Sequence, residues 1–152
     1  MKDLRILTQD PEKRAVLVAD CVALVDAEVK SKSGLTGVAV KTCYGLVKAI
    51  KPKIMENAID GLLDDFTAVL QRYHELFQQA GSPGTMENFL ADRAGDVSEE
   101  LLQVTDVRAR NSSNRTIVKA YNKLRPKGKL HVEQAVPNVG ALLDRHRAEL
   151  PG

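Results

Sequence analysis

Two aspartates hold the same place in two similar stretches of the chain. Asp26 and Asp106 each lie about one turn before the end of a predicted helix, where the helix dipole disfavours a carboxylate and calls for a compensating partner. In one interpretation each Asp bonds to a loop amide or to the base four residues on, Lys30 or Arg110. In the other, the carboxylates converge to bind a cation or to act as acid and base. Two isolated carboxylates make a weak site, so the structural interpretation is preferred.

Basic residues are concentrated in two segments that contain no acid. Residues 29–55 hold six Lys and residues 107–132 hold eight basic residues, whereas residues 56–100 hold ten acids against Arg72 and Arg93. Such segments are most often solvated faces, and their functional interpretation is contact with a polyanion. The candidate residues for that contact are Arg115, Lys119, Lys123, Arg125, Lys127, Lys129, Lys41 and Lys48.

A specific form of polyanion contact is DNA reading by a helix-turn-helix unit. The predicted helix over residues 114–124 follows another helix after a four-residue turn, and Arg115, Lys119 and Asn122 share one face of it. Basic and amide side chains on such a helix can enter a major groove. In the first half of the chain Gly45 stands in the place of Asn122. That copy therefore keeps charge but lacks the amide.

No other residues suggest a catalytic, metal or cofactor site. The three histidines, His74, His131 and His146, are scattered without metal-ligand spacing, and we expect them on the surface or partly buried. Cys21 and Cys43 are expected to be buried free thiols in a reducing cytoplasm. No phosphate loop or dinucleotide fingerprint occurs. We expect no catalytic residue, no metal and no cofactor.

The chain also lacks the sequence features of a membrane protein. Its longest apolar runs reach about five residues, against the ~20 that span a bilayer. Its first residues are charged and do not resemble a secretory leader. These features predict no membrane contact and a cytoplasmic location.

The elements that position these residues are all predicted to be helices, and the same helical unit is predicted to occur twice in the chain. Residues from Leu24 to Ser33 return 80 positions later, and residues from Val40 to Phe66 return 77 positions later. The repeats cover about residues 11–80 and 92–148. Because neither half alone can cover its helices, we expect a single domain over residues 1–152. It should have about seven helices, with the two units packed as one pseudo-two-fold bundle. A shallow two-repeat solenoid is the alternative, although solenoids usually need three or more repeats for stability.

Helix boundaries follow from caps and periodicity. Asp10-Pro11 should begin a helix whose buried stripe is Ala15, Val18, Val22, Val25 and Val29. A second helix is predicted to run to about Ile50, with Leu46 facing inward. A third is predicted over about residues 53–79, and a short one after Thr85. Asp96 and Glu99 have the spacing of a capping box. A helix should end at Arg125-Pro126, and Pro137 should kink or divide the last one.

Three stretches resemble a known family. They are residues 22–37 with Val40-Lys41, residues 101–110, and Lys119-Ala120-Tyr121 with residues 132–135. Together they resemble an uncharacterised family of short helical actinobacterial proteins, a domain of unknown function. The resemblance implies an all-helical fold and no catalytic residues.

These features predict a non-enzymatic helical interaction module that binds another protein or a second copy of itself. Binding of a polyanion or nucleic acid through the basic segments is the alternative.

Overall fold

Seven helices and no strands make up the structure, a computed structural model that describes residues 1–152. They are α1 (Ile6–Gln9), α2 (Pro11–Ser31), α3 (Gly34–Lys48), α4 (Ile54–Gln79), α5 (Met86–Ala91), α6 (Ala94–Arg110) and α7 (Arg115–Arg147). The predicted all-α class is confirmed. The cap predicted at Asp10 is also confirmed, since its carboxylate accepts from the amides of Glu12 and Lys13.

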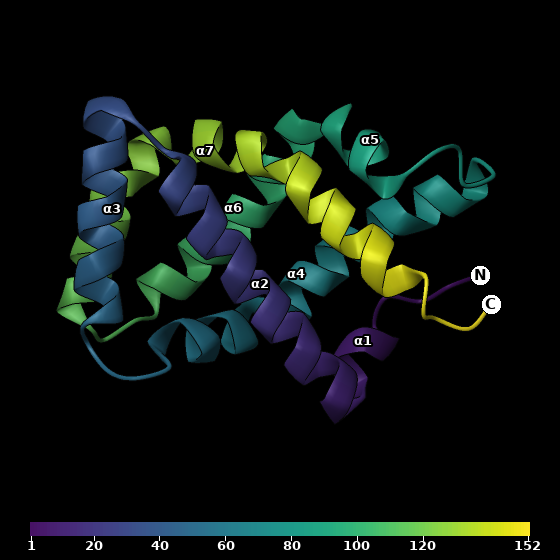
Figure 1. The fold of residues 1–152 in the computed structure, drawn as a ribbon, viewed down its shortest axis with the longest axis horizontal. Coiled ribbons are helices and arrows are strands. Elements are labelled where there is room, and N and C mark those ends of the chain that lie inside the picture. The colour runs from purple at the N-terminus through teal and green to yellow at the C-terminus, as the bar shows by residue number, and fades with distance from the viewer.

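The helices are arranged between two ends of the molecule (Figure 1). At one end α3 lies beside the first part of α7. From there α4 and the second part of α7 both run to the opposite end, where α5 packs against α7. Both termini also lie at that opposite end. The predicted duplication pairs α2 with α6, α3 with the first part of α7, and α4 with its second part.

The hydrophobic core occupies the end that holds α5 and the termini. It is built mainly from Leu and Val, with Phe77, Met86 and Leu90 fully buried. Arg14 joins α2 to α4 outside this core, with its guanidinium 2.7 Å from Asp60 and 2.8 Å from Asp64. The end formed by α3 is less completely packed. Leu35 and Val38 of α3 are 91% and 64% exposed.

The prediction that a helix ends at Arg125-Pro126 is wrong. α7 continues through Pro126 and Pro137 to Arg147. Each proline removes one hydrogen bond to the carbonyl four residues earlier, which favours a bend. The helix indeed bends where it leaves α3 and crosses to α5 (Figure 1). Packing on α3, α6 and α5 along its length lets the helix survive both prolines.

Several local predictions are also corrected. α6 begins at Ala94 after Arg93, without a side-chain cap, so Asp96 lies in the first turn and forms no capping box. Ala15 is exposed, and Leu46 is 56% exposed, because α2 and α3 turn those positions away from their neighbours. Cys43 is a buried free thiol, while Cys21 is free but only partly buried.

Two of the three histidines are more buried than predicted. His74 is fully buried and His146 is 7% exposed. His146 Nε2 lies 2.7 Å from an Asp20 carboxylate oxygen, which joins α7 to α2. His131 is partly buried as expected, but neither of its ring nitrogens has a hydrogen-bond partner.

Candidate functional site

Asp26 is bound by side chains of the next helix. The Tyr44 hydroxyl of α3 donates a hydrogen bond to its carboxylate, and Lys48 Nζ lies 3.7 Å from the same oxygen. Burial and the bond to Asp26 raise the pKa of Tyr44 well above its usual value. The phenol therefore stays protonated and donates to the carboxylate.

Asp106 has the same pattern of partners in the second half. The Tyr121 hydroxyl of α7 donates to its carboxylate, and Arg125 donates through Nε and Nη2 at 2.8 and 3.1 Å. The Arg125 guanidinium and the Tyr121 hydroxyl lower the pKa of Asp106. Thr105 Oγ1 also lies 2.9 Å from the Tyr121 hydroxyl.

These contacts favour the structural interpretation of the two aspartates. Their partners are a tyrosine and a cation one helix further on, whereas Lys30 and Arg110 form no ion pair with them. No three His, Cys, Asp or Glu side chains lie close enough together to hold a metal ion. The signal for the tyrosines was present in the sequence, because Tyr44 and Tyr121 match at the 77-residue offset.

The two basic segments lie at one end of the molecule. Residues 29–55 include α3 and residues 107–132 include the first part of α7, and these helices are neighbours (Figure 1). We call this part of the molecule the basic end. It carries 14 basic residues and no acid within those two segments.

One row of basic side chains follows α7 along this end. Arg115, Lys119, Lys123 and Lys127 recur every four residues, and all are exposed. We call this row the basic ridge. Its members lie about 6 Å apart along the helix axis, and none of them forms an ion pair. Lys41 on α3 is also exposed and unpaired.

The other candidate residues for polyanion contact already have acidic partners. Lys48 pairs with Asp26 and Arg125 with Asp106. Lys129 Nζ lies 3.2 Å from Glu99. The structure thus divides the predicted set into the ridge residues and Lys41, which are free to meet an anion, and residues that neutralise acids of this chain.

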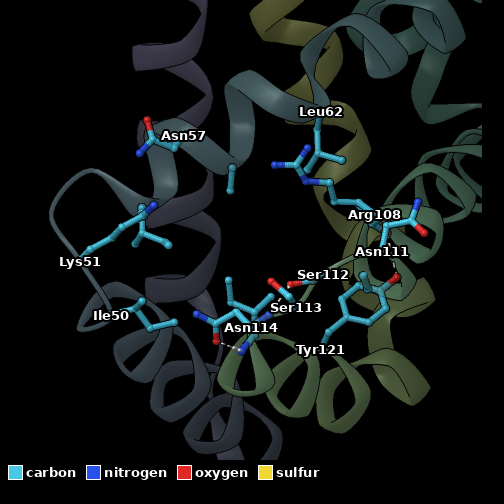
Figure 2. Close-up of a pocket in the computed structure, with 15 residues that line it drawn as sticks. Ile50, Lys51, Asn57, Leu62, Arg108, Asn111, Ser112, Ser113, Asn114 and Tyr121 are labelled. Atoms are coloured by element: carbon cyan, nitrogen blue, oxygen red, sulfur yellow. Dashed lines mark hydrogen bonds between the residues drawn. The ribbon is translucent and has the colours of Figure 1, made fainter.

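A cleft opens between the start of α4 and the loop that joins α6 to α7. Its volume is about 570 Å³. The side chain of Arg108 points into the opening beside Leu62, and Lys51 and Asn57 lie across from it (Figure 2). Ser112, Ser113 and the α7 cap Asn114 form another edge. We call this the Arg108 cleft. In the sequence Arg108 and Lys51 belong to the two basic segments, and their spacing does not mark them as parts of a site.

Glycine at position 61 makes room for the Arg108 side chain. A Cβ atom at this position of α4 would lie 2.6 Å from both terminal guanidinium nitrogens. Arg108 forms no hydrogen bond or ion pair, and no Asp or Glu lines the cleft. Its wall is apolar where Ile54, Leu62 and Ile117 contribute.

Comparisons with known proteins identify a family without an assigned activity. Residues 4–147 match DUF6918, a family of unknown function. No curated protein and no solved structure matches the chain. None of the helices is long and apolar enough to cross a membrane.

Proposed function

The chain belongs to DUF6918, a family of unknown function, and we propose that it is a binding module whose basic end contacts a polyanion of the nucleic-acid class. One observation carries the proposal. Two segments far apart in the sequence, both without acids, are brought together at one end of the fold. The fold therefore concentrates positive charge at one end of the molecule, although the net charge of the whole chain is only +2.

The basic ridge gives this charge a defined geometry. Four exposed side chains follow one helix over about 18 Å, and no carboxylate of the chain neutralises them. Binding to phosphates would release condensed counterions, so affinity should fall steeply as salt rises. Exposed aromatic side chains are scarce in this chain, which favours contacts with the backbone over base stacking.

We expect duplex DNA of random sequence to bind at low salt. A plot of log affinity against log salt should have a slope of about −3 to −4 if the four ridge residues each meet a phosphate. The double variant Lys119→Gln/Lys123→Gln should reduce that slope by about 2. Fluorescence anisotropy of a labelled duplex measures both quantities.

The matched control is Arg145→Gln, which removes an exposed charge from the distant part of the same helix. It should leave the slope unchanged. Absence of binding at low salt would remove the proposal. An equal effect of the ridge and Arg145 variants would show that binding follows net charge and not this surface.

An exposed apolar face on α3 favours a second function, self-association. Leu35, Val38 and Leu46 are 91%, 64% and 56% exposed, an unusual group of large apolar side chains on one short helix. A second copy is the proposed occupant. Because α3 also carries the unpaired Lys41, two copies would repel each other at low salt and associate more strongly at high salt.

Light scattering over a range of protein concentrations should show a dimer that strengthens with salt. Val38→Asp should give a monomer, because the interface would bury an unpaired carboxylate. Leu76→Asp is the control, since Leu76 is 52% exposed on α4, away from this face. A monomer at every concentration and salt would contradict self-association. Polyanion binding has the opposite salt dependence, so the two functions are distinguishable.

A further inference from the structure

A second cleft occupies the position that the predicted duplication assigns to a twin of the Arg108 cleft. It lies between the end of α2 and the second part of α7, and its volume is also about 570 Å³. We call it the Glu28 cleft. The offsets of 80 and 77 residues pair its positions with those around the Arg108 cleft. The pairs are Glu28 with Arg108, Ser31 with Asn111, Lys32 with Ser112, Ser33 with Ser113, Gln134 with Asn57, and Asn138 with Gly61.

In the Glu28 cleft the two charged side chains, Glu28 and Lys32, both have partners. Asn138 Nδ2 donates to Glu28 at 2.5 Å, and Lys32 Nζ lies 3.6 Å from the Glu28 carboxylate. Lys32 also donates to Gln134 at 3.1 Å. The acid and the base of this cleft thus pair with each other at the end of α2, each also bonds across the cleft to α7, and no unpaired charge is left for a ligand.

In the Arg108 cleft the residue that corresponds to Glu28 has no partner. Arg108 stands in the place of Glu28, and Gly61 stands in the place of Asn138, which binds Glu28. The carboxylate is therefore absent, and the Arg108 guanidinium occupies the space over Gly61. The lining contains two cations, Arg108 and Lys51, and no acid. The first amides of α7 are already bound by Asn114. The unpaired groups are therefore the Arg108 and Lys51 side chains and not the helix terminus.

We propose that the Arg108 cleft binds a small organic anion, with a carboxylate or phosphate group on the Arg108 guanidinium and an apolar body against Ile54, Leu62 and Ile117. A guanidinium binds either group through two parallel hydrogen bonds. The cleft volume lies within the usual range of small-molecule sites. The site does not depend on the basic ridge, which belongs to another surface of α7.

The test uses three probes with alkyl chains of six to eight carbons: octanoate, hexyl phosphate and uncharged hexanol, at constant ionic strength. Backbone amide spectra are recorded during titration. One or both anions should shift the signals of Asn57, Ser112 and Ser113 saturably, and hexanol should not. Comparison of octanoate with hexyl phosphate identifies which anionic group the cleft prefers.

Arg108→Gln should weaken anion binding about tenfold or more, because a charged hydrogen-bonded pair is lost. Arg108 bonds to nothing else in the chain, so the variant should fold. Arg110→Gln removes an exposed charge from the same helix and should bind like the wild type, as should Lys119→Gln/Lys123→Gln. The proposal would be overturned if neither anion bound saturably, or if Arg108→Gln bound with unchanged affinity. Either result would do so whatever the outcome for DNA.

Discussion

Replacement of Gly140 by alanine is expected to destabilise the protein by about 3 kcal/mol. A Cβ atom at position 140 of α7 would lie 2.6 Å from Glu87 Cα and 2.7 Å from the Met86 carbonyl oxygen. These are backbone atoms of α5, so no rotamer change can relieve the overlap. Overpacking of this kind costs about 1–3 kcal/mol, and a displaced α5 would also lose the second of its two caps, which supplements Thr85.

That cap comes from the same helix as Gly140. The Asp144 carboxylate accepts from the amides of Met86 and Glu87 at 2.8 and 3.1 Å. Loss of such a cap costs about 1 kcal/mol more. Urea unfolding measures the sum of the two effects. Met86 and Leu90 of α5 are fully buried, so displacement of this helix should also open the core.

Gly45→Ala is the matched control for this prediction. Gly45 also lies within a helix, but a Cβ atom there meets nothing within 4 Å. Alanine should therefore stabilise α3 by about 0.5–1 kcal/mol through its better helix propensity. If Gly140→Ala were as stable as the wild type, α5 could not be seated against α7 as described.

Acidification from pH 7.5 to 4.5 is expected to cost about 2 kcal/mol of stability through His74 alone. Burial, with smaller contributions from Arg147 and Lys2, lowers the pKa of His74 to about 4. Its unfolded value is about 6.5. Between these values the unfolded chain binds a proton that the folded chain does not, so stability falls as pH falls.

The contacts of His74 explain why the folded protein resists this proton. Arg147 Nε donates to His74 Nε2 at 3.0 Å, so that nitrogen must keep its lone pair. Protonation would place two N–H groups and two positive charges against each other. Gln78, which approaches the other ring nitrogen at 3.3 Å, is bound to the Lys2 backbone at 2.6 and 3.0 Å.

The measurement compares free energies of unfolding at the two pH values. His74→Gln should lose about 2 kcal/mol less than the wild type over this range, because it has no group to titrate at position 74. His131→Gln should retain the part of the pH dependence of stability that comes from His74. An identical pH dependence in wild type and His74→Gln would show that position 74 does not account for it.

Local signals in the sequence were sufficient for the helical class and for several helix ends, but not for the single helix that continues past Pro126. Asp10 and Thr85 cap helices as predicted, because a cap depends on residues two or three positions away. Periodicity identified the all-helical class for the same reason. It does not determine which face is covered, and it predicts an inward-facing Leu46 that the structure leaves exposed. Burial depends on the neighbouring helix, which short-range spacing does not specify.

For the candidate site too, some features follow from local sequence and others only from tertiary packing. The sequence by itself determined that acids are absent from two segments and that Asp26 and Asp106 hold equivalent places, since both facts are matters of composition and spacing. Only the tertiary structure decided that the two segments meet, that tyrosines bind the aspartates, and that Arg108 lies unpaired over Gly61. Those contacts join residues far apart in the chain, and the packing of whole helices, continued in α7 past two prolines, sets their distances.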